Sequence, residues 1–408
     1  MTLALIIFAI TYLMILGQQL PFVRLERPAA ALVGAVAMVA AGVVTPLEAY
    51  LDAIDHATIA LLLGMMILTG FLREAGFFRW ASWSALRAAR TPRRLLAGIT
   101  LLSAVLSAFL VNDTVCLMIT PLVVQLADDA DLPPLPFLLA VAFGSNAGSA
   151  ATPTGNPQNM LIANLSGISY TDFVSSLGPA ALVATSVVLA LLLLLCRKEL
   201  RARELGTLEI PPPPVDRVLL GKALLATCGV MIGFLLGFDL AWTALAGAAF
   251  MLLVGGRAHG ESLRQVNWLL LLFFAGLFVV VYGVGKSGAA QAAFDWATPL
   301  FAGGSIWQAT ILSTITAIGS NLFSNVPFVL LVGKWIPTLE EPEMAWKLLS
   351  LSSTLSGNLT ILGSVANLIV LDLAGARGQV SFGRFFAYGL PITLCSTAAG
   401  VAVLLWVG

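Results

Sequence analysis

The stretch GSNAGSAATPTGNPQN, residues 144–159, interrupts an otherwise apolar segment that runs from residue 136 to residue 166. Glycine and proline break a helix and free backbone polar groups, which lipid cannot satisfy. Such a break survives in a membrane only where the protein or a watery cavity supplies hydrogen-bond partners. The stretch therefore predicts a broken helix lined by neutral donors and acceptors, although a run of small residues also suits helix packing.

The composition of the chain is that of a membrane protein. Of its 408 residues, 59% are hydrophobic and 10% are charged, against about 45–50% and about 25% in soluble domains. Several apolar runs approach the ~20 residues that span a bilayer as a helix. We expect an all-α polytopic membrane protein without a signal peptide, because the apolar start lacks a basic stretch and a cleavage site.

Charge and cysteine content exclude several other functions. The net charge is zero, so no global field favours nucleic acid. The four cysteines are scattered and have no histidine neighbours that would complete a metal site. No nucleophile–base pair appears near a predicted midplane. We therefore expect no enzyme, no metal site and no cofactor.

The sequence divides into two halves that resemble each other. The segment Arg197–Arg217 is charged and contains four consecutive prolines, and we interpret it as a cytoplasmic linker between a first repeat, 1–196, and a second, 218–408. Matching residues recur in order at offsets of 208 to 213: Gly64 and Gly276, Asn112 and Asn325, Thr152 and Thr360, Gly155 and Gly363, Asn159 and Asn367. Chance similarity between apolar helices is the alternative.

The distribution of basic residues predicts the topology, because cytoplasmic loops are enriched in Lys and Arg. If 94–128 and 304–337 are re-entrant hairpins, eighteen of the 21 Lys and Arg residues lie on one face. Each half then has five spans and one hairpin, and the second half is inverted. The predicted spans are 2–20, 28–45, 55–73, 136–166, 175–196, 218–237, 241–256, 266–285, 345–374 and 385–407. We expect a plasma-membrane (cell inner membrane) protein with the basic loops in the cytoplasm and both termini on the outer face.

The triplet Asn112-Asp113-Thr114 is placed at the tip of the first hairpin. A carboxylate near the membrane centre costs at least ~2.5–3.5 kcal/mol on insertion scales, and such groups are functional by default. Removal from water disfavours the charged form, which makes Asp113 a candidate proton or cation site. A helix-capping role is the alternative. The second tip, Ser324-Asn325, has Val326 in place of the acid, so only the first half can titrate.

At these residues the chain resembles the ion transporter superfamily, and the motifs VNDT and TPTGNPQN, with SN and ILGSVAN in the second half, most resemble the arsenite–antimonite efflux permeases. The resemblance implies a scaffold, often dimeric, and a moving domain that works as an elevator; a separate ATPase subunit could assist. It implies proton or cation coupling at Asp113. It also assigns substrate contacts to Asn112, Thr114, Asn146, Thr152, Gly155, Asn156, Asn159, Ser324, Asn325, Thr360, Gly363 and Asn367.

The tips depart from the Ser-Asn-Thr triplets that dicarboxylate carriers of the superfamily show. No Arg or Lys is expected at the site to pair a carboxylate substrate. A neutral trihydroxide such as As(OH)₃ would suit Asn, Thr, Ser and backbone groups. We therefore expect secondary active efflux of arsenite and antimonite in exchange for protons. A sodium/proton antiporter on the same scaffold is the alternative, and a carboxylate carrier or a passive channel is less favoured.

Overall fold

The computed structural model describes residues 2–16, 25–87, 89–200, 212–256 and 258–407. Within these ranges the chain is helical and has no strand. Six helices of the described residues are long and apolar enough to cross a membrane, and four shorter apolar helices accompany them. The chain is thus the all-α membrane protein that its composition predicts.

The first half contains, in order, α1 (Thr2–Leu16), α2 (Arg27–Ala40), α3 (Pro46–Glu48) with a π-helical turn (Ala49–Ala53), α4 (His56–Glu74), α5 (Phe77–Leu86), α6 (Pro92–Phe109), α7 (Asn112–Asp129), α8 (Leu135–Ser149), α9 (Pro157–Ser166) and α10 (Tyr170–Leu195). Two features distinguish this half from a series of simple spans. Helices α6 and α7 pack on each other as a hairpin, and α8 and α9 are separated by a break that contains a 3₁₀ turn, Pro153–Gly155.

The second half repeats this order with α11 (Arg217–Leu235), α12 (Leu240–Val254), α13 (Ala258–Arg264), α14 (Trp268–Lys286), α15 (Ala289–Ala297), α16 (Ser305–Phe323), α17 (Asn325–Gly333), α18 (Pro342–Ser356), α19 (Val365–Leu373) and α20 (Phe382–Val407). Helices α16 and α17 form its hairpin. The break between α18 and α19 contains a 3₁₀ turn, Ile361–Gly363, and two further 3₁₀ turns flank the hairpin at Thr298–Phe301 and Ile336–Thr338.

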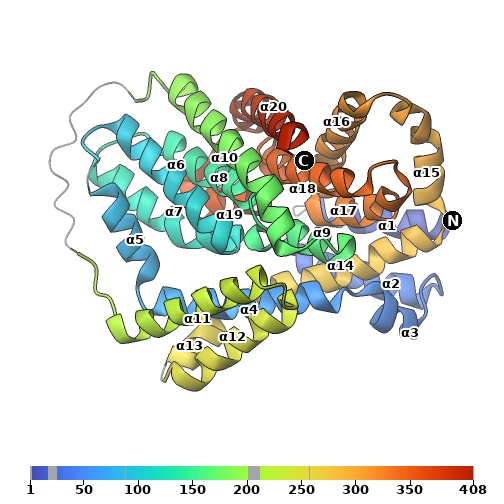
Figure 1. Ribbon diagram of the computed structural model, residues 1–408, viewed down its shortest axis with the longest axis horizontal. Helices are drawn as coiled ribbons and strands as arrows, with labels where there is room; N and C mark the ends of the chain where they lie inside the picture. The colour runs from blue at the N-terminus through green and yellow to red at the C-terminus, as the bar shows by residue number, and fades with distance from the viewer. Residues whose placement is uncertain (1, 17–24, 88, 201–211, 257, 408) are drawn as a thin grey trace.

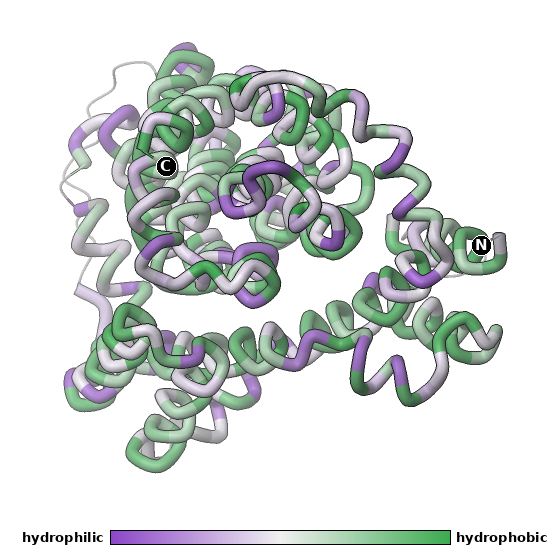
Figure 2. The backbone as a smooth tube through the Cα atoms, turned by 45° about the vertical axis from the view of Figure 1, so that its right-hand side comes forward, coloured by the Kyte–Doolittle hydropathy of each residue, from purple (hydrophilic) through white to green (hydrophobic). Residues whose placement is uncertain are grey.

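The helices form two bodies (Figure 1). One layer contains α4 packed on α11 and α12, and α14 packed on α1 and α2. The other is a bundle in which α6 packs on α8, α16 on α18, and α10 on α20. Figure 2 shows the same two bodies from a second direction, with hydrophobic residues distributed along both. The hairpins and broken helices all belong to the bundle, and they meet the layer at α4 and α14.

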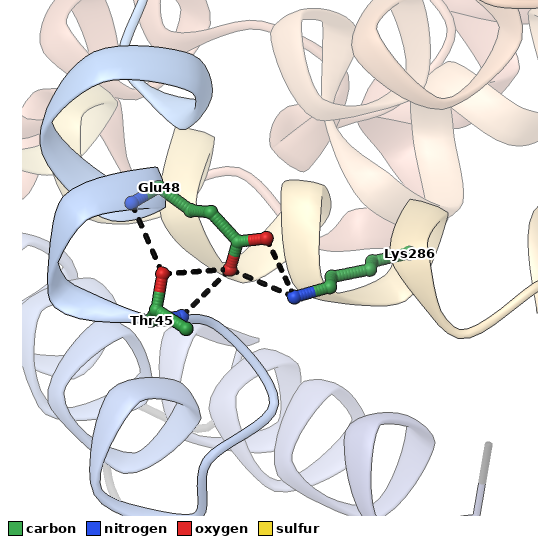
Figure 3. Close-up of polar contacts among 3 residues, drawn as sticks. All are labelled: Thr45, Glu48 and Lys286. Carbon is green, nitrogen blue, oxygen red and sulfur yellow. Dashed lines mark hydrogen bonds and ion pairs between the residues drawn. The ribbon is translucent and has the colours of Figure 1, made fainter.

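Contacts between the two halves fasten the layer (Figure 3). Lys286 Nζ, at the end of α14, donates to both carboxylate oxygens of Glu48 at 2.7 Å. Thr45 and Glu48 form a capping box that begins α3. The Lys286 ammonium, assisted by hydrogen bonds from Thr45, lowers the pKa of Glu48 from 4.5 to about 2. At the end of α4, Glu74 accepts a hydrogen bond from Gln265 Nε2.

The predicted spans correspond to helices of the structure, with three differences. The short helices α5, α13 and α15 were not predicted, because they are too short or too polar to register as spans. The segment 136–166 divides into α8 and α9 at the predicted break, and the segment 345–374 likewise divides into α18 and α19. Of the predicted linker, residues 201–211 lie outside the described ranges, and residues 212–216 have no regular secondary structure.

Candidate functional site

The break between α8 and α9 is closed by asparagine side chains. Asn156 caps α9 by accepting a hydrogen bond from Asn159 N at 2.9 Å. Asn159 Nδ2 donates to the carbonyls of Ser149 and Thr152, each at 3.1 Å. The backbone acceptors that the break frees are thus satisfied by the protein itself, as a break inside a membrane requires.

The second break is built in the same way. Asn367 Nδ2 donates to the carbonyls of Gly357, at 2.7 Å, and Thr360, at 2.9 Å. Ser364 caps α19 by accepting a hydrogen bond from Ala366 N at 3.2 Å. Asn156 and Ser364 therefore both cap the helix that follows the break, each in its own half.

Both breaks require a glycine. A Cβ on Gly155 would lie 2.2 Å from the carbonyl oxygen of Ser149. A Cβ on Gly363 would lie 2.6 Å from Asn321 Oδ1 and 3.0 Å from the carbonyl oxygen of Gly357. The resemblance assigned substrate contacts to both glycines, whereas the structure shows a steric role: each allows a neighbouring group to lie where a Cβ would be.

Each hairpin is joined to the broken helix of its own half by a threonine. Thr152 Oγ1 donates to the carbonyl of Ala108, near the end of α6, at 2.6 Å. Thr360 Oγ1 donates to Asn321 Oδ1, near the end of α16, at 2.8 Å. The tip of the second hairpin turns at Ser324, which has a φ of 67°. This left-handed backbone is unfavourable for a residue other than glycine and sets the second tip apart from the first.

Asn146 connects the two halves at the centre of the bundle. Its Oδ1 accepts hydrogen bonds from Asn112 Nδ2 at 3.2 Å and from Ser364 Oγ at 3.0 Å. Its Nδ2 donates to Asn358 Oδ1 at 2.8 Å and to Asn367 Oδ1 at 3.2 Å. These four bonds use the full hydrogen-bonding capacity of a primary amide. Asn146 therefore holds the first hairpin tip against the second broken helix.

Three buried amide atoms at the hairpin tips and the second break have no hydrogen-bond partner in the described chain. They are Oδ1 of Asn112, Oδ1 of Asn325 and Nδ2 of Asn358. The three side chains are 3%, 7% and 0% exposed. A buried polar atom without a partner costs about 1–3 kcal/mol, so two acceptors and one donor are available at the hairpin tips and the second break.

Asp113 lies in the first turn of α7 and is 7% exposed. The N-cap of α7 is Val111, and no backbone N–H of the described residues donates to the Asp113 carboxylate. The carboxylate instead faces a cavity of about 100 Å³ between α4, α7, α14 and α19. The polar residues around this cavity are Thr69, Arg73, Asp113, Thr114, Gln265 and Asn267.

A basic side chain lies at this cavity, contrary to expectation. Arg73, which the sequence placed at an ordinary helix end, lines the cavity together with Asp113. Because its position is at the end of α4, far from the tip motif in sequence, only the packing of α4 against α7 shows the relationship. The expectation that the site has no Arg or Lys was therefore wrong at the Asp113 cavity, and also at the second tip, where Arg27 lines a cavity with Ser324.

The structure thus joins most of the predicted site residues but distributes them over distinct positions. Asn146 bonds to both Asn112 and Asn367, Asp113 and Thr114 share the cavity, and Ser324 and Asn325 form the second tip. Sequence analysis did not assign roles to residues that complete the network: Ser350, Thr354, Asn321, Asn358 and Ser364. Asn321 lies 213 positions after Ala108, whose backbone carbonyl accepts the corresponding bond from Thr152, so nothing in the sequence indicated this amide.

Comparison with known proteins identifies the family. The sequence model of the citrate transporter (CitMHS) family matches residues 3–349. The chain is also 31% identical over 466 residues to the silicon efflux transporter LSI3 of Oryza sativa subsp. japonica, with 97% of this chain and 96% of that protein covered. This chain belongs to the CitMHS family of the ion transporter superfamily. It is a membrane transporter and not an enzyme.

Two further comparisons concern a protein of similar sequence and a solved structure. A Dictyostelium discoideum protein that carries the name arsB is 24% identical, with 94% of this chain and 88% of that protein covered. The crystal structure of the Alcanivorax borkumensis YdaH transporter has a TM-score of 0.58 to this chain, covers 100% of it and is 15% identical. At that identity the match shows a shared fold.

Proposed function

We propose that this CitMHS family member exports arsenite and antimonite, as neutral trihydroxides, in exchange for protons. The observation that carries the proposal is the uncharged set of buried amide atoms at the hairpin tips and the second break. A small polyhydroxide both donates and accepts hydrogen bonds, so it complements two amide oxygens and one amide nitrogen. Each bond contributes about 1 kcal/mol, which suits a substrate that must also be released.

Asp113 is the proposed coupling group. Its carboxyl group is buried at the mouth of a cavity of about 100 Å³ and is held away from bulk water. Loss of hydration favours the neutral, protonated carboxyl, and intramembrane acids of this kind commonly relay protons. Arg73 at the same cavity would stabilise the carboxylate after the proton leaves.

Silicic acid is a second candidate substrate, favoured by the relative whose name is silicon efflux transporter LSI3. Si(OH)₄ is a neutral polyhydroxide like As(OH)₃, so the same amide atoms would serve both. Citrate, which gives the family its name, would bring several negative charges next to Asp113. Among the described residues, Arg73 is the one basic residue that lines the Asp113 cavity, and it cannot balance such a charge. Sodium, bound by Asp113 and carbonyl oxygens, is the remaining alternative.

For the transport cycle we propose alternating access in a protein built from two inverted repeats. The bundle moves as an elevator against the layer that contains α4 and α14. Helices that are interrupted inside the membrane, in two halves of equal order, support this mechanism. The distribution of Lys and Arg supports a plasma-membrane location with cytoplasmic basic loops and both termini outside. We also propose a homodimer, as the resemblance implies, and the sequence leaves open whether an ATPase subunit assists.

The test is transport by purified protein in liposomes with an imposed pH gradient, with arsenite, silicic acid, citrate and sodium measured in the same preparation. We expect flux of the neutral hydroxides and a several-fold loss in Asn325→Ala, because the substrate loses one hydrogen bond. Gln125→Ala, on the exposed side of α7, is the matched control and should transport normally. Sodium/proton exchange without arsenite or silicic acid flux would overturn the proposal in favour of a sodium antiporter, and citrate flux would favour a carboxylate carrier.

A further inference from the structure

One polar contact joins the bundle to the layer at the N-terminal end of α4. Asn164 Nδ2, in the last turns of α9, donates to both carboxylate oxygens of Asp55, at 2.9 and 2.8 Å. Asp55 is also the N-cap of α4 and accepts a hydrogen bond from Thr58 N at 2.9 Å. A single carboxylate thus holds the start of α4 and the end of α9 together.

The two halves place an equivalent pair at the opposite end of the interface. The offset of 212 that relates α4 to α14 takes Asp55 to Asn267, and the offset of 208 that relates α9 to α19 takes Asn164 to Asp372. Asn267 caps α14 as Asp55 caps α4, by accepting a hydrogen bond from Leu270 N at 3.0 Å. The acid and the amide have exchanged places between the two pairs.

The exchange preserves the chemistry of the contact. When Asn267 uses its Oδ1 for the helix cap, its Nδ2 remains free to donate to a carboxylate. Asp372 is the acceptor that such a donor requires. A charge-assisted bond between amide and carboxylate is therefore available at both ends, with its direction reversed.

In this structure the first pair is closed and the second is open. Asp372 is exposed, and no hydrogen bond joins it to Asn267 among the described residues. The two residues nevertheless lie on facing elements, since Ile369, one helical turn before Asp372, lines the same cavity as Asn267. Closure of this pair would require α19 to move towards the start of α14.

We propose that Asp55–Asn164 and Asn267–Asp372 are alternating latches, each of which closes in one of the two end conformations. The proposal rests on the proposed alternating access, and it adds the contacts that hold each end state. In the conformation described here α9 packs on α4 and the first latch is closed. When the bundle moves, the first latch opens and the second closes, so the two conformations keep similar stability.

Cysteine cross-linking in a background without the four native cysteines tests this directly. One variant contains Asp55→Cys with Asn164→Cys, and the other contains Asn267→Cys with Asp372→Cys; each is treated with a short bis-methanethiosulfonate reagent in membranes. We expect both pairs to cross-link, in separate populations. Adding Asn164→Ala to the 267/372 pair should raise its yield several-fold, because the first conformation loses its latch. Asp129→Asn, on the exposed end of α7, should leave both yields unchanged.

A residue swap separates the latch from a purely structural contact. Asn164→Asp alone places two carboxylates together and should slow transport several-fold, whereas Asp55→Asn with Asn164→Asp recreates the arrangement of the other latch and should restore it. If the protein transports arsenite but the 267/372 pair never cross-links, the latches are wrong and the proposed function stands. Reciprocal cross-linking in a protein that does not move arsenite would support the latches and reject the proposed substrate.

Discussion

Asn159 and Asn367 make the same pair of hydrogen bonds in the two halves of the protein: each side-chain amide donates to the backbone carbonyls seven and ten residues before it. The distances are 3.1 Å for both bonds of Asn159, and 2.9 and 2.7 Å for those of Asn367. An interrupted helix leaves carbonyls that lipid cannot satisfy. The two asparagines satisfy these carbonyls at the corresponding place in each half.

Replacement of either asparagine by alanine should destabilise the fold. Each substitution removes two hydrogen bonds to buried carbonyls, worth about 1 kcal/mol apiece and more when the acceptor stays unsatisfied. We expect Asn159→Ala and Asn367→Ala each to lower Tm by several degrees in detergent, measured by size-exclusion chromatography after heating. Gln125→Ala should not change Tm, and an unchanged Tm in both asparagine variants would show that other groups satisfy the breaks.

Gly155→Ala should be more damaging than Gly363→Ala. At Gly155 the new Cβ meets a backbone carbonyl at 2.2 Å, whereas at Gly363 its nearest neighbour, at 2.6 Å, is the movable end of the Asn321 side chain. We expect loss of folded protein for the first and a smaller decrease in Tm for the second. Gly221→Ala in α11, where no atom lies within 4 Å, is the matched control and should be neutral or slightly stabilising.

Asp113→Asn should uncouple transport from protons. The amide keeps the shape of the side chain but cannot exchange a proton, so accumulation driven by a pH gradient should disappear while substrate exchange between the two sides persists in part. The measurement compares pH-driven uptake with counterflow in liposomes, with Asp129→Asn as the control on the same helix. Gradient-driven transport by Asp113→Asn at the normal rate would mean that Asp113 has only a structural role.

The Glu48–Lys286 pair should contribute stability that depends on pH. The pKa of Glu48 is lowered from 4.5 to about 2, so the contribution is fully present above about pH 4.5 and is lost as the pH falls towards 2. We expect Glu48→Gln to lower Tm at pH 7 and to reduce the loss of Tm between pH 5 and pH 3 relative to the unmodified protein. Equal pH dependence in the two proteins would show that the pair does not stabilise the layer.

The ends of the two hairpins should face opposite sides of the membrane. Cysteines at Asp129, after the first hairpin, and Lys334, after the second, should react with an impermeant maleimide from the cytoplasmic and the outer side respectively. The experiment uses inside-out and right-side-out vesicles of a variant without the native cysteines, and Arg264→Cys, in a loop that we expect to be cytoplasmic, is the reference position. Labelling of both positions from one side would exclude the inverted arrangement.

Much of the architecture could be predicted because it follows from local patterns. Apolar runs predicted the spanning helices, and the glycines and prolines between Gly144 and Asn159 predicted the break between α8 and α9. The position of Asp113 between apolar segments predicted a buried acid at a hairpin tip, where the structure places it. The short helices α5, α13 and α15 were missed because they do not span a bilayer and so lack the apolar length on which the prediction depended.

The partners of individual side chains could not be predicted in this way. Asn146 bonds to Asn358 and Asn367, which lie 212 and 221 positions away in the chain. The sequence predicted that Asn146 is a buried amide. It did not predict that four protein groups use all of its hydrogen-bonding capacity. The presence of Arg73 at the Asp113 cavity was also hidden, because nothing local to α4 indicates that its end packs against α7.

The sequence by itself determined that this chain is a helical membrane protein, and it predicted two similar halves, interrupted helices and one acid at a hairpin tip. Those features depend on hydrophobicity, helix breaking and the cost of burying a charge, which are properties of residues and their neighbours in the chain. Only the tertiary structure decided which amides are saturated and which are free, and that Asp55 holds Asn164 while Asn267 and Asp372 stay apart. A hydrogen bond extends only about 3 Å, so its partners are set by how the two halves pack and not by the order of residues in either one.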